Sequence, residues 1–374
     1  KKLFFSTCFT VLSCIMSIAQ SQLWVVGNQY LDGPTPLFLP TPAGPSGLDY
    51  AGQQAQYAAN AWHNPQTGAL LFFVVDGVVY DGEGYFIGEM VAASASPGTC
   101  RGTEEICVFP DPGSCTRYYI ISSADLQLIS TGNFSGGLRQ MATISLLDLS
   151  LNNENYSDRK GALVNITNFS GQSFINSITM RNNPEDEFYS APKLAQTKIA
   201  VTPLRQDNSR LVFFSNSYGI GARIINANGI QNLVSTGLSF NVSHMMSNVS
   251  NDDNLVRLRG EMEVVPLNNG NYRIAVPYIH LEATNGIVPI DPNNPQTPGG
   301  EPTTWVSAKN IALFIAELNA NGQLIAGTDK RIILNHHPQL NQRPYIHGLE
   351  FSPDGNTLYV SHVETNEHPY PLWF

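Results

Sequence analysis

The sequence predicts an all-β protein. Short apolar runs alternate along the chain with clusters of Gly, Pro, Asn and Asp, the residues that form tight turns. The chain holds 31 Gly and 24 Pro in 374 residues, and no stretch has the apolar spacing of a 12-residue amphipathic helix. Hydrophobic residues make up 42% and charged residues 13%, which argues against disorder and for a core flanked by uncharged polar loops. The length suffices for one large all-β domain or two average ones.

The clearest strand–turn–strand pattern lies near the C-terminal end. An apolar strand over Ile346–Phe351 and a second strand over Thr357–Ser361 flank a tight turn. In this turn Pro353 sets φ of the second position, Asp354 is able to hydrogen-bond its own backbone, and Gly355 accepts a positive φ. The pattern therefore predicts a hairpin.

Related units precede this hairpin. They follow one order, an apolar strand, a polar turn, an apolar-aromatic strand and further strands, over residues 60–90, 105–166, 193–238 and 260–334. Units recur roughly every 50 to 75 residues, near or above the spacing of propeller blades. Asp76-Gly77 between apolar runs is a strong hairpin signal in the first of them.

These periods predict a β-propeller of four-stranded antiparallel blades, with the fifth, last unit truncated. A two-sheet sandwich would not predict the recurring four-strand order, and a β-helix would show shorter and stricter repeats. The predicted organisation is a signal peptide over residues 1–19, a lead strand with a Pro/Gly-rich segment over 20–59, and the propeller over 60–374.

The N-terminal residues resemble a secretory signal. Lys1 and Lys2 precede an apolar run that ends in the small residue Ala19 before polar residues. A buried strand, a short membrane helix and a lipoprotein cleavage box ending at Cys14 are the alternatives. We expect cleavage near Ala19 and a secreted or cell-surface protein without a transmembrane segment in the mature fragment.

The chain starts at Lys1 rather than Met and stops in the apolar run Pro371–Phe374. The sequence therefore reads as the front part of a longer protein. Its net charge is −10 with a pI near 5.2, and such an acidic surface repels phosphate backbones and anionic lipids. No nucleic-acid partner is expected.

Three cysteines remain after the two in the signal: Cys100, Cys107 and Cys115. Export permits disulfides. Cys107 and Cys115 are equidistant in sequence from Asp111 in a predicted hairpin, so they are expected to face each other at bridgeable distance. The rival pairing is Cys100 with Cys107.

No residue is predicted to be catalytic. His336 and His337 are adjacent, so on a strand they point to opposite faces and make a poor chelate. His347 and His362 lie near the ends of the last strand pair, where lining or packing is expected. Asp354 does not match a sialidase-like Asp box, because Gly355 comes one place early and no Trp follows.

Two glycine-rich sequences, Gly82-Glu83-Gly84 and Gly219-Ile220-Gly221, follow no βαβ pattern and are interpreted as turns rather than nucleotide loops. No Gly-x-Ser-x-Gly elbow is present.

No cofactor is expected, and Ca²⁺ is the alternative left open. Acidic loops supply candidate ligands at Asp76, Asp81, Glu83, Asp252, Asp253 and Asp291. None of these loops has the alternating carboxylates of a dedicated calcium loop. A sugar-stacking surface and ordinary blade packing are the two interpretations of Trp62, Tyr118, Tyr119, Trp305 and Tyr345.

The stretch FSPDGNTLYVS (Phe351–Ser361) resembles the "Ser-Pro-Asp-Gly" propeller repeats of secreted and periplasmic proteins. Together with Asn64–Met90, Ile106–Ser123 and Ile144–Leu163, it resembles the N-terminal propellers of large surface proteins exported by the type IX pathway of gliding-type bacteria. The resemblance covers residues 60–374, less closely between 239 and 305. It implies a C-terminal sorting domain beyond this fragment and a binding or scaffold role, and it carries over no catalytic residue.

We therefore expect a non-enzymatic binding or scaffold module for protein or glycan partners, since loops on a rigid scaffold carry recognition. The alternative is a carbohydrate-active or peptidase-type enzyme, whose chemistry comes from loop carboxylates or a downstream domain. An enzyme should show two close carboxylates or a triad in a deep pocket.

Overall fold

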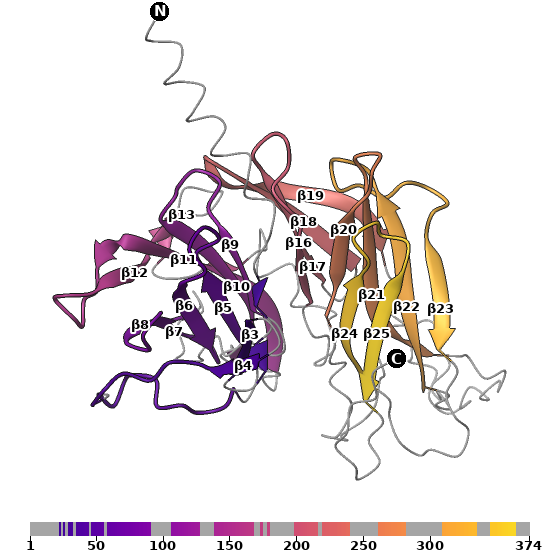
Figure 1. Ribbon diagram of the computed structural model, residues 1–374. Coiled ribbons are helices and arrows are strands. Elements are labelled where there is room, and N and C mark those ends of the chain that lie inside the picture. Colours follow the sequence, from indigo (N-terminus) through magenta and orange to yellow (C-terminus); the bar gives the residue numbers. More distant parts are fainter. Residues whose placement is uncertain are drawn as a thin grey trace, which may run out of the picture. The chain divides into compact units, whose positions relative to one another are not determined.

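The computed structural model describes residues 22–23, 25–26, 29–32, 35–44, 46–55, 58–90, 106–127, 138–167, 173–174, 178–179, 198–215, 219–239, 261–281, 309–334 and 345–363. Every regular element in these ranges is a β-strand and none is a helix, which confirms the all-β prediction (Figure 1). The described residues up to 215, with 221–235, form one compact unit. The described residues from 261 onward, with 219–220 and 236–239, form a second unit.

The first sheet of the first unit is an antiparallel meander joined by one strand from the N-terminal part of the chain. Its order is β1 (Gln22–Leu23), β5 (Ala59–His63), β6 (Leu70–Val75), β7 (Val78–Asp81) and β8 (Phe86–Glu89). The β6–β7 turn has φ of 51° at Asp76 and 82° at Gly77, so both central residues are left-handed as in a hairpin turn. The predicted Asp-Gly hairpin is confirmed.

A small separate sheet precedes this meander along the chain. It contains β2 (Val25–Val26), β3 (Gln29–Asp32) and β4 (Thr35–Phe38). After β4, Leu39 and Tyr50 enter the core of the first sheet, where Tyr50 is fully buried and its ring contacts those of Phe73 and Tyr80. The segment before residue 60 thus contributes to the first sheet, which its Pro/Gly-rich composition did not indicate.

The second sheet is also a meander in sequence order. It contains β9 (Ile106–Pro110), β10 (Arg117–Gln127), β11 (Leu138–Asn152) and β12 (Lys160–Val164), and β15 (Ile178–Thr179) also pairs with β11. A short pair, β13 (Ile166–Thr167) and β14 (Ser173–Phe174), follows β12. The third sheet contains β16 (Ile199–Val201), β17 (Arg210–Ser215), β18 (Gly219–Asn226) and β19 (Gly229–Ser239).

Consecutive sheets of the first unit pack against each other through their apolar faces. The core between the first and second sheets includes Trp62, Phe72 and Val74 on one side and Val108, Ile120 and Leu147 on the other. Gly161 belongs to this junction: its φ is +116°, and a Cβ there would lie 2.8 Å from Ile87 Cδ1. A second core, which includes Phe109, Ile121, Ile144, Val212 and Phe214, joins the second and third sheets. Burial of these faces drives the stacking.

In the second unit, too, sheets pack against each other through apolar residues. Its four-stranded sheet contains β20 (Glu263–Pro266), β21 (Tyr272–Leu281), β22 (Lys309–Leu318) and β23 (Lys330–Leu334), and β24 (Tyr345–Phe351) pairs with β25 (Leu358–Val363). Val265, Leu313, Leu349 and Phe351 form a shared apolar core.

The β24–β25 turn has the predicted chemistry. Gly355 has φ of 69° and its N–H donates to the Ser352 carbonyl at 2.7 Å, while Asp354 Oδ1 accepts the Asn356 N–H at 3.0 Å. Sequential four-stranded meanders that stack through apolar faces are compatible with a propeller-like fold.

Candidate functional site

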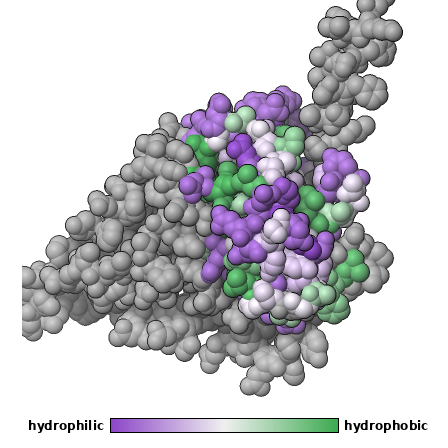
Figure 2. Space-filling view, turned by 90° about the vertical axis from the view of Figure 1, so that its left-hand side faces the viewer, coloured by the Kyte–Doolittle hydropathy of each residue, from purple (hydrophilic) through white to green (hydrophobic). Residues whose placement is uncertain are grey.

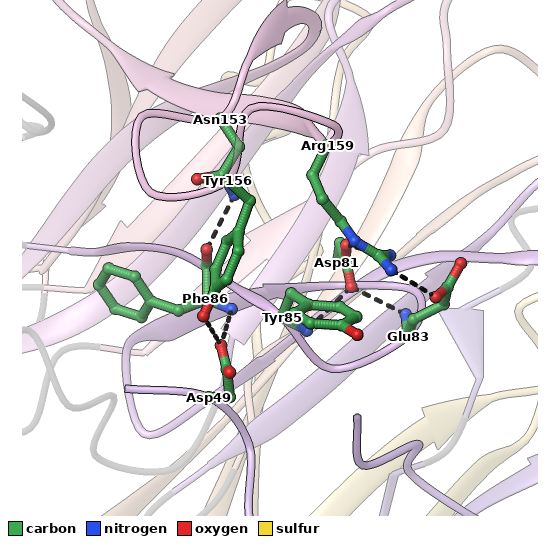
Figure 3. Close-up of polar contacts among 8 residues, drawn as sticks. All are labelled: Asp49, Asp81, Glu83, Tyr85, Phe86, Asn153, Tyr156 and Arg159. Atoms are coloured by element: carbon green, nitrogen blue, oxygen red, sulfur yellow. Dashed lines mark hydrogen bonds and ion pairs between the residues drawn. The ribbon is translucent and has the colours of Figure 1, made fainter. Parts of the chain in front are cut away.

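Three segments far apart in the sequence meet in the first unit: the loop 46–50, the β7–β8 turn and the connection between β11 and β12 (Figure 3). We name their polar and aromatic side chains the loop cluster. Its members are Asp49, Asp81, Glu83, Tyr85, Asn153, Tyr156 and Arg159.

Asp49 is the acceptor that ties the first segment to the other two. Its Oδ2 accepts the Ser46 N–H at 2.7 Å, and its Oδ1 accepts the Phe86 N–H at 3.1 Å and the Tyr156 hydroxyl at 2.5 Å. Burial by itself would raise the pKa of Asp49, but the hydrogen bonds from Tyr156, Phe86 and Ser46 outweigh it and hold this pKa below 3.8. The same bond to Asp49 raises the pKa of Tyr156.

Asp81 and Glu83 form the second part of the loop cluster around one guanidinium. Asp81 Oδ1 accepts the N–H groups of Glu83 and Tyr85, each at 2.9 Å, so it shapes the β7–β8 turn. Asp81 Oδ2 lies 3.2 Å from Arg159 Nη1, and Glu83 Oε2 lies 2.9 Å from Arg159 Nη2. The bond to Glu83, together with the charge of Asp81, raises the pKa of Arg159 despite its desolvation.

The two tyrosines complete the arrangement. The guanidinium carbon of Arg159 lies 3.6 Å from the centroid of the Tyr85 ring, a cation–π contact. The rings of Tyr85 and Tyr156 meet edge to face with centroids 5.2 Å apart. The buried Asn153 donates its side-chain N–H to the Phe86 carbonyl at 2.8 Å. These contacts hold three loops in one fixed geometry.

The carboxylates of the loop cluster act as hydrogen-bond acceptors. The oxygens of Asp49 and Asp81 accept hydrogen bonds from backbone and side-chain donors, and an Asp49 that is ionised at neutral pH is not a proton donor. The glutamate of the cluster, Glu83, has a side chain that is 70% exposed. Among the residues that are coloured in Figure 2, hydrophilic and hydrophobic groups are interspersed.

The structure brings together two of the candidate calcium ligands, Asp81 and Glu83, but with Arg159 between them. Asp76 instead lies in the β6–β7 turn, and its Oδ1 accepts the N–H of Ala58, the residue before β5, at 3.3 Å. The other acidic candidates, Asp252, Asp253 and Asp291, lie outside the described residues. Among the side chains that the structure describes, no group of three or more His, Cys, Asp or Glu residues is placed to hold a metal ion.

Three of the candidate aromatics are core residues. Trp62, Tyr118 and Tyr119 are between 4% and 7% exposed, and the rings of Trp62 and Tyr118 lie 5.8 Å apart. The packing interpretation is confirmed for them, and a sugar-stacking role is wrong. Tyr345 lies in β24, and Trp305 lies outside the described residues.

The histidine candidates are not brought together as a site in the described residues. His347 lies in β24, and His362 lies in β25 opposite Ile346. His336 and His337 fall outside the described residues.

The expected placement of Cys107 opposite Cys115 is wrong. Pro110 pairs with Tyr118, so the hairpin centres on Ser114 rather than Asp111, and Cys107 lies opposite Ile121. Cys115 lies in the exposed turn, and no disulfide joins these two described cysteines. Cys100 lies outside the described residues, so its pairing with Cys107 stays a prediction.

Sequence reasoning missed most of the loop cluster. Asp49 and Tyr156 are separated by 107 residues, and Asp81 and Arg159 by 78. No local motif marks these pairs, because only the stacking of the first sheet on the second brings their loops together.

Comparison with known protein-family models finds no match, and neither does comparison with curated protein sequences. In the described part of the chain, no helix has the length and hydrophobicity needed to cross a bilayer.

Proposed function

We propose that this protein is a secreted or cell-surface β-propeller that acts as a non-enzymatic binding or scaffold module for protein or glycan partners. The observation that carries the proposal is the loop cluster, in which carboxylates bind backbone N–H groups of their own and neighbouring loops. Loops fixed in this way lose little conformational entropy when a partner binds, so they suit recognition.

The propeller type and the export route rest on the sequence. The repeated meanders support the propeller, and the stretch Phe351–Ser361 resembles the repeats of type IX-exported surface proteins. The apolar segment that ends at Ala19 supports export.

The test applies the purified chain to an oligosaccharide array and to a panel of purified cell-envelope proteins, and measures bound ligand and released products. We expect saturable binding without turnover. Tyr85→Ala should weaken binding at least tenfold, because it removes the ring between Arg159 and Tyr156. The matched control is Tyr359→Ala, a 55% exposed tyrosine of the second unit, which should bind like the unmodified chain.

Circular dichroism and urea unfolding serve as the controls that both variants are folded. Release of sugars or peptides with multiple turnovers would contradict the proposal and favour the carbohydrate-active or peptidase-type alternative. Equal binding by both variants would exclude the loop cluster as the recognition surface.

A further inference from the structure

Two arginine side chains are buried in the third sheet of the first unit. Arg210 begins β17 and is 6% exposed, and Arg223 in β18 is fully buried. Val212, Phe214 and Ile225 of the same two strands belong to the core that joins this sheet to the second sheet. Residues two positions apart on a strand share a face, so both arginines lie on the face that packs on the second sheet.

Arg210 has few partners in this core. Its Nη1 donates to the Thr202 carbonyl at 2.8 Å, and its guanidinium carbon lies 5.5 Å from the centroid of the Phe109 ring in β9. Its Nε is buried and has no hydrogen-bond partner among the described residues. Burial lowers the pKa of Arg210 and of Arg223 to about 10, so both groups stay charged at neutral pH.

The carboxylates nearest in sequence on the adjoining segments bind other cations. Asp111, directly after β9, has its Oδ2 3.0 Å from Arg117 Nη2. Asp207 in the β16–β17 turn has its Oδ2 3.5 Å from Arg205 Nη2. Among the ion pairs that the structure describes, none includes Arg210. A buried cation without a counter-charge destabilises a fold, so an anion taken up from solution would be bound favourably here.

We propose that Arg210 anchors a binding site for a small oxyanion of the phosphate type at the junction of the second and third sheets. The Nε–H and an Nη2–H of a guanidinium point the same way and bind two oxygens of one oxyanion. Nε is the donor that lacks a partner, and the bond from Nη1 to Thr202 stays in place when this edge is occupied. Arg223 adds a second positive charge to the same face, which favours an anion over a neutral ligand.

The test uses the full chain, refolded from urea in phosphate-free buffer so that no anion is carried over. Inorganic phosphate is then titrated at constant ionic strength and neutral pH, and calorimetry and urea unfolding measure its effect. We expect saturable binding of one phosphate per chain. A ligand that binds only the folded chain lowers the unfolding constant by the factor 1 + [phosphate]/Kd, so the constant should fall about tenfold at a phosphate concentration roughly ten times Kd.

Arg210→Met keeps a long apolar side chain but removes the charge and the donors, so it should lose phosphate binding and the stabilisation by phosphate. Arg210→Lys keeps the charge but lacks the paired donors of the guanidinium, and it should bind phosphate at least tenfold more weakly. The matched control is Arg331→Met, at an exposed position of the second unit, which should bind phosphate like the unmodified chain.

The inference is overturned if phosphate does not bind the unmodified chain, or if Arg210→Met binds it with the same affinity. A loss of binding in Arg331→Met equal to that in Arg210→Met would indicate attraction to the net charge of the surface and would also overturn it. If Arg210→Met does not fold, Arg210→Lys decides, and an affinity equal to that of the unmodified chain has the same consequence.

Discussion

At the scale of single residues, two glycines with positive φ distinguish two costs of adding a side chain: the cost of a left-handed backbone and the cost of a steric clash. Gly68 has φ of +71° and open space around the position of a Cβ. Gly84 has φ of +93°, and a Cβ there would collide with the Pro40 carbonyl oxygen and lie 2.9 Å from Pro42. Gly84 is thus required both by its turn and by the approach of the lead segment.

We expect Gly68→Ala to lower the free energy of unfolding by about 1 kcal/mol, the cost of a left-handed conformation for an L residue. Gly84→Ala should lower it by roughly 3 kcal/mol, because the added methyl also displaces the backbone at Pro40. Urea unfolding at neutral pH measures both. Equal losses in the two variants would show that the lead segment does not pack on the β7–β8 turn.

The wrong prediction that Cys107 faces Cys115 also has its explanation at the residue scale. Its predicted geometry depended on which residue centres the hairpin, and a turn rich in Pro, Gly and Ser allows several centres. The β9–β10 pairing centres the hairpin on Ser114. This register places Val108 opposite Ile120 in the first core and Phe109 opposite Tyr119 in the second.

At the scale of elements, local sequence chemistry predicted strands and turns well. Asp76-Gly77 and Asp354-Gly355 form the turns expected of them, and each complete unit of the repeat contains a sequential antiparallel meander. Pairings between strands that are far apart in the sequence were not predictable. β1 joins β5 although 35 residues separate Leu23 from Ala59, and nothing in either short segment specifies the other.

The loop cluster gives an element-level prediction, because the Tyr156 hydroxyl joins the β11–β12 connection to the loop 46–50. Tyr156→Phe removes this bond and should lower the free energy of unfolding by about 1 to 2 kcal/mol at neutral pH, as expected for a bond to an ionised group. Tyr359→Phe, at an exposed position, is the control and should change it by less than about 0.5 kcal/mol.

The pH dependence of this effect has a definite sign. The pKa of Asp49 is lowered in the folded protein, so its contribution is present above the ordinary value of 3.8 and is lost as pH falls through the folded value. The difference between Tyr156→Phe and the unmodified chain should therefore shrink in strong acid. A difference of constant size from neutral to acid pH would mean that the bond does not depend on ionised Asp49.

At the scale of the whole molecule, the stacked sheets explain the composition. The larger described sheets bury apolar residues on faces that pack on a neighbouring sheet, which accounts for many hydrophobic and few charged residues. The polar loops between the strands are the part of the molecule to which we assign the proposed recognition.

The proposed export also belongs to this scale. We expect the protein expressed with its natural leader to be found outside the cell, with an N-terminus at or next to Gln20, measured by mass spectrometry of the intact protein. Retention of residues 1–19 would contradict the signal peptide. A lipid-modified N-terminus at Cys14 would instead support the lipoprotein alternative.

The sequence by itself determined the all-β class, the strand order within each repeat unit and the chemistry of the Asp-Gly turns, because these depend on neighbours within a few residues. Only the tertiary structure decided which loops meet and that Trp62 and Tyr118 lie in a core. The physical reason is that these contacts form between stacked sheets. Their partners are selected by burial and register across the fold, and no local pattern encodes such pairs.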